Sequence, residues 1–424
     1  DHATRGMKRR SYHDPLHGEI VLDSNDPAEA MVIALIDAPA FQRLRRIRQL
    51  GPAFLTFHGA ESSRFTHSIG VLHLARRALQ HLERLTPELA DYRGLIYGAA
   101  RLHDVGHAPL SHAGEEMFGL HHEAWSARLV QECPDLRDPL EAWAPGTAKA
   151  VAELLEHGRS PHPAAKALIS SQLDCDRLDY LRRDSYSTGT SYGQLDLDRL
   201  IAALTLAPDG QLALHPRGRS AVEHYLVVRS LMYSTVYNHR LNIVANWLLQ
   251  QIVRQARQSQ PDALFADAVM ARWLWDPDAM DSSTYLANDD LRTGYHLQRW
   301  REEGPAPLQE LCRRLLDRDL LQATDVRGLD HTQRLEALAM AQRLSQAAGL
   351  DPDLCCGLRE RRSTGYRPYV GGLRLWNGQD LQALEQVSPL VNSLSQPQEL
   401  AWLLHPREVR DQLRQQLPAA TPAA

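Results

Sequence analysis

Apolar and polar positions alternate along much of the chain with the period of an α-helix. Apolar residues recur at helical spacing in four stretches, which are 69–85, 94–105, 222–253 and 331–346. Such spacing places the apolar side chains on one face of a helix, where they pack on a core. The pattern therefore predicts a mainly helical protein.

Strand signals are short and local. The segment 18–23 is the best strand candidate near the start, and Asn25-Asp26-Pro27 after it is typical of a helix start. Around 204–216, two short apolar runs flank a Pro-Asp-Gly turn signal, which predicts a hairpin. A third β-like patch lies at 366–376. We expect small β-elements on a helical core, and no period indicates a repeat fold.

The length of 424 residues exceeds what one hydrophobic core of ordinary size holds, so we expect two lobes. Weak boundaries at 257–262 and 302–307 divide the chain into a catalytic domain over 7–257 and a C-terminal α+β lobe over 258–416. Residues 1–6 precede Met7 and are interpreted as a tag remnant. The Pro- and Ala-rich tail 417–424 is expected to be disordered.

Composition narrows the class of protein. The chain is 43% hydrophobic and 23% charged, as in soluble globular proteins, without an apolar run of membrane-spanning length or a signal-peptide pattern. Its five cysteines form no C-x-x-C pair and are odd in number, which favours a reducing, cytoplasmic location without a disulfide framework. The net charge of −5 argues against a broad nucleic-acid surface, so phosphate binding must come from local clusters. No P-loop motif is present.

The strongest chemical signal is Arg101-Leu-His103-Asp104-Val-Gly-His107-Ala-Pro-Leu-Ser-His112. Metal sites for phosphate chemistry use mixed nitrogen and carboxylate ligands, and His103 with Asp104 supplies one of each. Neighbouring residues can share a metal only near a helix end, and Gly106 and Pro109 break the helix just after them. His67 and Asp176 lie in other segments and complete an H…HD…D set.

Each member of this set also has a structural interpretation. A lone histidine such as His67 is more often a satisfied core residue than a ligand, and a His-Asp dipeptide is commoner than metal sites. Asp174, Asp176 and Asp179 are also compatible with a solvated helix face. The four residues in this order, with Gly106-His107 after the dipeptide, favour the metal interpretation.

Seven motifs in order give the chain a specific resemblance, from about Tyr12 to about Asn246. They are Asp14-Pro-Leu-His17-Gly18, Phe41-Gln42-Arg43-Leu-Arg45, Gln49-Leu50-Gly51, Arg64-Phe-Thr-His67-Ser, His103-Asp104-Val-Gly-His107-Ala-Pro-Leu-Ser-His112, Asp174-Cys-Asp176-Arg177-Leu-Asp179-Tyr180 and Arg229-Ser-Leu-Met-Tyr233-Ser-Thr-Val-Tyr237-Asn-His239-Arg240. The chain resembles the HD-domain metal phosphohydrolases, and within them the SAM-and-HD-domain deoxynucleoside triphosphate triphosphohydrolases. The resemblance implies a mainly α fold with an HD-domain helical core, and an accessory SAM module is expected to be absent.

The family cleaves between the α-phosphate and the sugar O5′, which implies a deoxynucleoside and inorganic triphosphate as products. By the resemblance, the metal ligands are His67, His103, Asp104 and Asp176, holding a divalent Fe, Mn, Mg or Zn ion, with a second Mg²⁺ as an option beside Asp104. His112 matches the family's general acid, and Glu115 and His122 match the residues that orient it. Glu115 stands where the family usually has Asp, and it is also compatible with a solvated helix position.

The resemblance also implies a substrate site. It assigns phosphate contacts to Arg64, His107, Arg177 and Arg229, and contacts to the sugar 3′-hydroxyl to Tyr180 and Asp184. The wall that excludes a 2′-hydroxyl is assigned to Gln49, Leu50 and Tyr237, with Tyr233 adjoining. Arg177 replaces the lysine usual after the fourth ligand, which exchanges a point charge for a planar fork. The spacing of Tyr233 and Tyr237 is equally that of ordinary core residues.

A separate site for an activating nucleotide follows from the same resemblance. Asp37, Gln42 and Arg45 match residues that read guanine, and Arg10 stands where a lysine contacts phosphate. His13 departs from the family's asparagine, and this segment is also compatible with a helix start and a solvated face. The implied partners are a deoxynucleoside triphosphate substrate, a GTP or deoxynucleotide activator, and further copies of the chain, with a tetramer favoured.

Two other classes of function stay open on the sequence. The first is an HD hydrolase for another phosphorylated ligand, such as a nucleoside monophosphate or a cyclic dinucleotide. Such an enzyme needs the metal ligands but no residues that bind a triphosphate. The second is a non-enzymatic nucleotide or nucleic-acid binding module, which the net charge and the complete ligand set disfavour. Neither a membrane nor a nucleic acid is expected as a partner.

Overall fold

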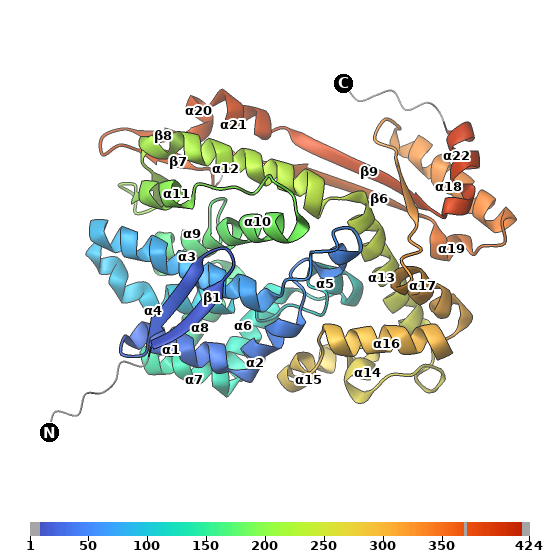
Figure 1. Cartoon of the computed structure of the whole chain (residues 1–424), viewed down its shortest axis with the longest axis horizontal. Helices are drawn as coiled ribbons and strands as arrows, with labels where there is room; N and C mark the ends of the chain where they lie inside the picture. The colour runs from blue at the N-terminus through green and yellow to red at the C-terminus, as the bar shows by residue number, and fades with distance from the viewer. Residues whose placement is uncertain (1–8, 369–370, 418–424) are drawn as a thin grey trace.

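Helices dominate the computed structural model, which describes residues 9–368 and 371–417 (Figure 1). Among the helices of the first 258 residues, α3, α4 and α10 carry or adjoin the predicted metal ligands. They are α1 (Pro27–Asp37), α2 (Pro39–Gln42), α3 (Arg64–Leu85), α4 (Arg93–Leu102), α5 (His112–Phe118), α6 (His122–Glu132), α7 (Pro134–Trp143), α8 (Thr147–His157), α9 (Pro163–Ile169), α10 (Cys175–Thr188), α11 (Leu197–Ala203), α12 (Arg219–Met232) and α13 (Arg240–Gln258).

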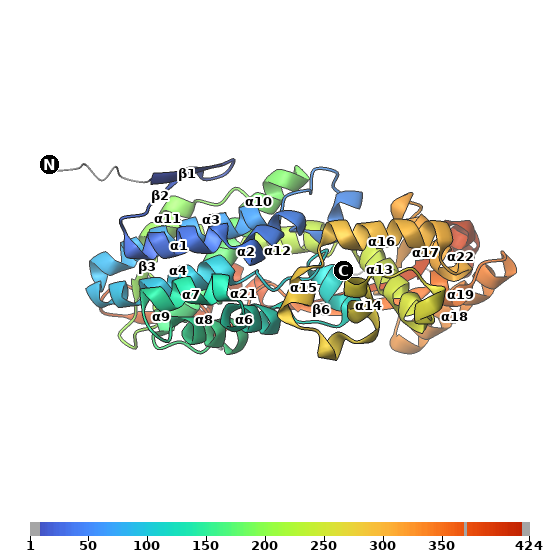
Figure 2. The same ribbon diagram turned by 90° about the horizontal axis from the view of Figure 1, so that it is seen from below.

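Most of the remaining helices lie toward the other end of the elongated molecule, whereas α20 and α21 lie beside α12 (Figure 1 and Figure 2). They are α14 (Ala268–Trp275), α15 (Ser282–Leu286), α16 (Asp290–Glu303), α17 (Ala306–Leu316), α18 (His331–Ala347), α19 (Pro352–Cys355), α20 (Leu384–Val387), α21 (Pro389–Leu394) and α22 (Arg410–Gln416). The helices predicted over 69–85, 94–105 and 331–346 correspond to α3, α4 and α18. The prediction of a mainly helical fold with small β-elements is confirmed.

Three small sheets complete the fold. β1 (Arg9–Asp14) and β2 (Gly18–Asp23) form an antiparallel hairpin, and β2 occupies the predicted segment. The predicted hairpin around 204–216 is β3 (Leu204–Leu206) with β4 (Leu212–Leu214). It is extended by β7 (Arg374–Trp376), parallel to β4, and β8 (Leu381–Ala383). The part of the chain that follows residue 360 therefore returns to the helices of the first 258 residues.

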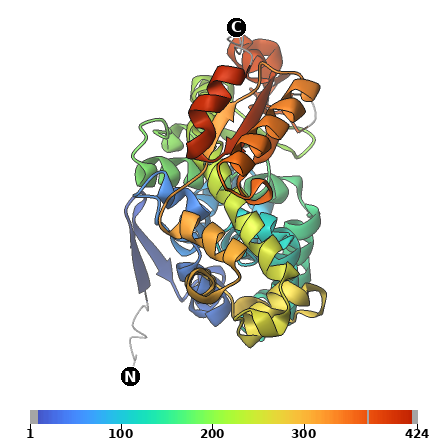
Figure 3. The same cartoon turned by 90° about the vertical axis from the view of Figure 1, so that its right-hand side faces the viewer.

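The third sheet belongs to the C-terminal part. β9 (Pro397–His405) lies between β5 (Gln322–Asp325) and β6 (Gly357–Thr364), all antiparallel, with α18 against β6 and β9 (Figure 3). Of the β-like patch expected at 366–376, Arg374–Trp376 forms a strand, and residues 369–370 lie outside the described residues. The division into domains at 257/258 falls at the end of α13 and stays a prediction.

Local sequence explains where the helices begin and end. α1 begins at Pro27 because the Asp26 carboxylate accepts hydrogen bonds from the backbone N–H groups of the first turn. The apolar stretch 222–253 is interrupted, however, since α12 ends at Met232 and a π-helical turn over Tyr233–Tyr237 precedes α13. Such turns insert an extra residue into a helix and often occur at functional sites. Hydropathy alone does not report this insertion.

Several expectations concern the ends, the cysteines and the membrane. The predicted tag remnant 1–6 and all of the predicted tail except Leu417 lie outside the described residues. All five cysteines are buried and unbridged. Within the described parts of the chain, every helix is too short or too polar to cross a membrane.

One buried side chain lowers the stability of the folded state. Arg101 on α4 is fully buried, and none of its three guanidinium nitrogens has a hydrogen-bond partner among the described residues. It packs over the ring of Phe41 at 3.7 Å, and burial holds its pKa well below the usual range. An unpaired buried charge is strongly unfavourable.

We therefore expect Arg101→Met to raise the free energy of unfolding by about 1–4 kcal/mol, the range seen when buried ion pairs are replaced by apolar residues of similar volume. The matched control is Arg43→Met. Arg43 is equally buried but donates to the carbonyls of Asn288 (2.8 Å) and His107 (2.9 Å), so its loss should destabilise the fold. Chemical denaturation of both variants tests this, and a loss of stability in Arg101→Met would contradict it.

Candidate metal centre and active site

Four predicted ligands converge from three elements. His67 lies in the first turns of α3, His103 caps the C-terminus of α4 with Asp104 directly after it, and Asp176 lies in the first turn of α10. His67 Nε2 lies 2.8 Å from Asp176 Oδ1 and 3.3 Å from His103 Nε2. Asp104 oxygens lie 3.5 Å from His67 Nε2 and 3.4 Å from His103 Nε2.

The other ring nitrogens fix how the two histidines are used. His67 Nδ1 contacts Asp179 Oδ2 at 2.7 Å, and His103 Nδ1 contacts the Ala100 carbonyl at 2.8 Å. Because both partners only accept, each Nδ1 carries a proton, so Nε2 is the nitrogen that each ring can offer to a metal ion. The two Nε2 atoms lie close to Asp176 Oδ1, and with Asp104 beside them they form a donor set suited to a divalent metal ion.

The electrostatics of the cluster favour a positive charge at this place. Burial opposes protonation of His67, but hydrogen bonds to Asp176 and Asp179 raise its pKa to about 10. Burial likewise opposes ionisation of Asp104, but the charge of Arg64 and of two histidines holds the pKa of Asp104 well below its usual range. The carboxylates are therefore ionised at neutral pH, and a cation, as a proton or a metal ion, neutralises them.

Asp179 organises the cluster from behind, and sequence reasoning gave it no role. Besides His67, it accepts from His17 Nε2 (2.7 Å) and from Arg183 (2.9 and 3.0 Å), and Arg183 also donates to Asp14 at 2.9 Å. On α3, a Cβ at position 70 would lie 1.9 Å from the Asp179 carboxylate, so Gly70 makes this approach possible. The sequence signals were the two motifs that contain these residues, Asp14-Pro-Leu-His17-Gly18 and Asp174-Cys-Asp176-Arg177-Leu-Asp179-Tyr180.

The interpretation of the 174–179 carboxylates as a solvated helix face is wrong. The Asp174 side chain is 1% exposed and caps α10, and that of Asp179 is fully buried. Asp176 alone is partly exposed, at 30%.

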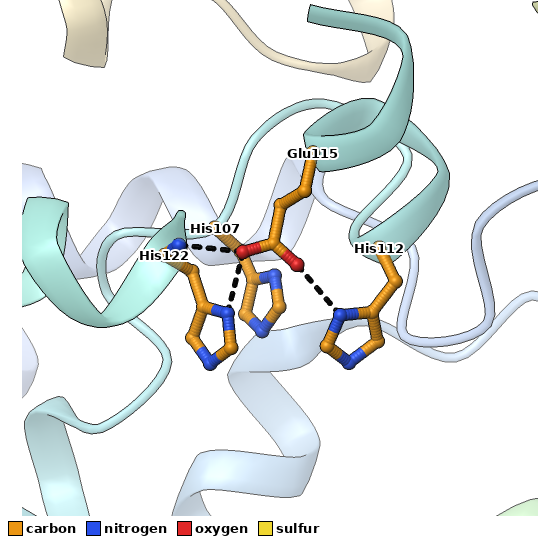
Figure 4. A group of neighbouring side chains, drawn as sticks. All are labelled: His107, His112, Glu115 and His122. Atoms are coloured by element: carbon orange, nitrogen blue, oxygen red, sulfur yellow. Dashed lines mark hydrogen bonds and ion pairs between the residues drawn. The ribbon is translucent and has the colours of Figure 1, made fainter. Parts of the chain in front are cut away.

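A second chain of polar groups starts at the beginning of α5. His112 Nδ1 and His122 Nδ1 each lie 2.6 Å from a different oxygen of Glu115, which also accepts from the His122 backbone N–H (Figure 4). The His122 ring stacks on His107 at 4.0 Å, and His107 Nε2 lies 3.2 Å from Asp104. The histidine chain is therefore connected to the metal ligands through His107.

Glu115 is an ionised hub and not a solvated residue, since its side chain is 12% exposed. Burial opposes its ionisation, but hydrogen bonds from His112 and His122 hold the pKa of Glu115 well below its usual range. Burial would lower the pKa of His122, and Glu115 raises it instead. An ionised carboxylate only accepts, so His112 carries a proton on Nδ1 and presents Nε2 elsewhere. The His112 side chain is 65% exposed, which leaves Nε2 accessible.

The turn before His112 is strained. Leu110 and Ser111 both have positive φ, at 61° and 58°, which is rare for residues with side chains. Asp290, the first residue of α16, accepts from the backbone N–H groups of Leu110 (2.7 Å) and Arg48 (2.8 Å) and so holds the turn. Strain of this kind concentrates where side chains must be aimed. Sequence reasoning missed Asp290, because nothing local connects it to position 110.

The predicted substrate residues form three groups. In the first group, Arg64 donates to Asp104 at 2.9 Å, beside His107. Gln49, which is buried, directly precedes Leu50 in the chain. Tyr180 and Tyr233 share a hydrogen bond of 2.7 Å, and Tyr237 donates to Asp184 at 2.6 Å. Arg177 and Arg229 line a large cavity with Tyr233. The structure brings the tyrosine pairs together across α10 and the π-helical turn.

The residues of the predicted activating site also lie together, at the surface end of α1 and α2. Arg10 Nη1 lies 2.5 Å from Asp37 Oδ1, and Arg45 Nε donates to Gln42 Oε1 at 2.8 Å. The Gln42 amide donates to the Ile36 carbonyl at 2.7 Å. Arg10 and Asp37 are both partly exposed. His13 lies on β1 opposite Glu19.

Comparison with known proteins agrees with this architecture. Residues 64–184 match the HD domain model, and 195–419, more than half of the chain, match the model of the HD associated region. The uncharacterized protein YwfO of Bacillus subtilis is 33% identical over 399 residues, which is 92% of this chain and 90% of that protein.

Two further likenesses are informative. A deoxynucleoside triphosphate triphosphohydrolase SAMHD1 homologue of Dictyostelium discoideum is 28% identical over 61% of this chain, which corresponds to 52% of that protein, so about half of that relative is matched. A crystal structure of a phosphohydrolase from Bacteroides thetaiotaomicron superposes with a TM-score of 0.81 at 24% identity. It covers 94% of this chain and all of that chain, which shows a shared fold.

Proposed function

This chain belongs to the HD-domain phosphohydrolases, and on that premise we propose that it hydrolyses deoxynucleoside triphosphates to a deoxynucleoside and inorganic triphosphate. The main support is the convergence of His67 Nε2 and His103 Nε2 on one point, with the His112–Glu115–His122 chain beside it. A relative of similar sequence is named for the same reaction.

His67, His103, Asp104 and Asp176 fit a metal ion, since they offer two nitrogens with lone pairs and two ionised carboxylates. When bound, a divalent cation supplies electrostatic stabilisation of the charge that develops on the phosphoryl oxygens. Asp179 and the Ala100 carbonyl keep the two imidazoles in the tautomer that ligation requires. Arg64, which already contacts Asp104, lies where it can meet a phosphate oxygen.

His112 is the proposed general acid. The deoxynucleoside O5′ is a poor leaving group, so it must be protonated as its bond to phosphorus breaks. Glu115 holds the Nδ1 proton of His112 in place, which directs Nε2 toward the reacting side, and His122 fixes Glu115 from behind. The hydrogen-bonded residues His112, Glu115 and His122 thus supply and stabilise a charged imidazole during proton transfer.

Tyr180, Asp184 and Tyr237 are the proposed sugar contacts. Burial raises the pKa of Asp184 to about 7, even though Tyr237 donates a hydrogen bond to its Oδ2. Asp184 Oδ1 is buried without a hydrogen-bond partner among the described residues, so it can receive the 3′-hydroxyl of a substrate. Tyr237 with Leu50 forms the proposed wall against a 2′-hydroxyl.

Product analysis tests the proposed function. The full chain, loaded in turn with Mn²⁺, Mg²⁺ or Fe²⁺, is incubated with each of the four deoxynucleoside triphosphates, with and without GTP, and the phosphate products are resolved by ion chromatography. We expect inorganic triphosphate in equal amount to deoxynucleoside. Release of monophosphate or pyrophosphate, or turnover only of a monophosphate or a cyclic dinucleotide, would instead assign another HD-type reaction.

We further propose that a guanine nucleotide binds near Asp37, Gln42 and Arg45 and stabilises a homo-oligomer, with a tetramer as the favoured state. A carboxylate can accept from the guanine N1–H and amino group, while an arginine donates to O6. Because a ligand that binds only the assembled state shifts the equilibrium by mass action, activation and assembly should change together.

Asp37→Ala is accordingly expected to lower GTP affinity by about tenfold or more, since a charge-assisted hydrogen bond is lost. The exposed Arg10–Asp37 pair adds little stability, so the fold should be unaffected. Light scattering and activity with and without GTP measure both effects, with the exposed Asp91→Ala as control. Equal assembly and activity in the absence of GTP would rule out this regulation.

A further inference from the structure

A cavity of about 1090 Å³ lies between the catalytic helices and the returning C-terminal chain. Its walls come from α9, α10 and α12, from β4, and from the chain around β6 and β7, which Figure 1 places beside α12. The metal ligands do not line it. Tyr233, which does, is hydrogen-bonded to Tyr180, and the Tyr180 ring lies 6.4 Å from that of His67. The cavity therefore begins just beyond the active-site tyrosines.

Basic side chains dominate the charged lining. Six cations face two acids, Asp209 and Glu385, and the cations are Lys166, Arg177, Arg229, Arg362, Arg367 and Arg374. Asp209 is already neutralised by Arg374 through hydrogen bonds of 2.8 and 3.0 Å. Glu385 is buried and accepts from the Tyr366 hydroxyl at 2.9 Å. A surplus of positive charge remains although the whole chain is acidic.

Two of these cations have unused donors. Arg229 Nη1 and Arg177 Nε are buried without hydrogen-bond partners among the described residues. Arg177 Nη1 donates to both Asp174 and the Ser171 carbonyl, so the direction of the guanidinium is fixed. Buried N–H donors that remain unpaired cost free energy, and an oxyanion in the cavity would satisfy them.

The C-terminal wall is fixed by backbone contacts. The Gln172 amide donates to the carbonyls of Arg367 and Gly371, both at 2.8 Å, and accepts from the Arg367 N–H at 2.9 Å. The Arg367 side chain takes no part in this clamp. Arg362 lines the cavity from β6, whereas its neighbour Arg361 points elsewhere and donates to Glu116 at 3.0 Å, as alternation along a strand requires.

We propose that this cavity binds a linear polyphosphate, with the arginines of the C-terminal chain extending the phosphate grip of Arg177 and Arg229. The guanidinium fork suits bidentate contacts to phosphate oxygens, and five of the six cations are arginines. The inference rests on the proposed function only in naming a source, the inorganic triphosphate released at the metal centre. A nucleoside triphosphate offers the same chemistry through its phosphate tail.

Direct binding tests the cavity without any need for turnover. Inorganic triphosphate, and separately GTP, is titrated by calorimetry into the full metal-loaded chain and into Arg362→Gln/Arg367→Gln. The clamp on Gln172 uses only the backbone of Arg367, so the variant should fold. Lys166→Gln on the opposite wall repeats the test independently, and Arg361→Gln is the matched control.

We expect the double variant and Lys166→Gln to bind at least one ligand about tenfold or more weakly, as the loss of one charge-assisted hydrogen bond predicts, while Arg361→Gln binds like the unaltered chain. Weaker binding of triphosphate identifies the product as a source, and weaker binding of GTP alone identifies a nucleotide. Unchanged affinity for both, or an equal loss in Arg361→Gln, would overturn the proposal.

The two proposals can fail separately. Weaker binding in the cavity variants of a chain that never forms triphosphate from deoxynucleotides would uphold the cavity and remove the proposed function. Triphosphate formation with unchanged binding in these variants would do the reverse.

Discussion

Replacing Asp104 by asparagine is expected to remove both the bound metal and turnover. Asp104 approaches both ligand imidazoles and also pairs with Arg64 at 2.9 Å, so removing its charge affects His67, His103 and Arg64 together. Loss of a hydrogen-bonded partner behind a ligand typically weakens metal binding by about 10–100-fold, and loss of a charged ligand should exceed this. Metal content by elemental analysis and the initial rate at saturating metal measure the two effects.

The same change leaves Arg64 buried without its partner, and breaking a buried pair typically costs about 3–5 kcal/mol. Asp176→Asn is therefore the companion variant, because Asp176 is the most exposed of the four proposed ligands and it also touches His67 and His103. Asp138→Asn, an exposed carboxylate on α7, is the control. Full activity of folded Asp176→Asn in the presence of chelator would contradict the metal site.

The sequence was informative where function imposes adjacent or ordered residues. The His103-Asp104 dipeptide needs a helix end, and Gly106 and Pro109 predicted one. In the structure α4 ends at Leu102. Helical periodicity similarly located α3 and α18, because an amphipathic helix must repeat its apolar face.

Contacts between distant segments were not predictable from local pattern. Asp179 supports His67 across 112 residues, and Asp290 holds the Leu110 turn across 180. An aspartate that supports a distant residue has the same local sequence as one in solvent, which is why the carboxylates of α10 were open to the wrong interpretation. The π-helical turn was not predicted for a related reason, because one inserted residue hardly changes the hydrophobic pattern.

The return of the C-terminal chain to the catalytic helices was likewise beyond the sequence. β7 pairs with β4 through a single parallel contact between Leu214 and Leu375, and Gln172 holds the loop that precedes it. Neither contact follows from composition or periodicity. The cationic cavity depends on both, so only the three-dimensional structure brings its two walls together.

His112→Gln is expected to lower kcat by about 10²–10⁴-fold, the usual contribution of a positioned general acid, with metal content and substrate affinity nearly unchanged. Glutamine preserves polarity and approximate size but cannot deliver a proton, and an exposed side chain can be exchanged without disturbing the core. His121→Gln is the matched control, because His121 is an exposed neighbour outside the His112–Glu115–His122 chain.

The decisive measurement is metal content beside the rate. His107, His112, Glu115 and His122 offer ligand atoms that lie within 4.8 Å of one another, so this group could itself hold a metal ion. If His112→Gln loses metal in proportion to activity, His112 is a ligand and the acid must be sought elsewhere. If metal is retained, a substrate analogue whose leaving group needs no proton should raise the rate of His112→Gln far more than that of the unaltered chain. The reason is that only the step that needs the acid is impaired in the variant.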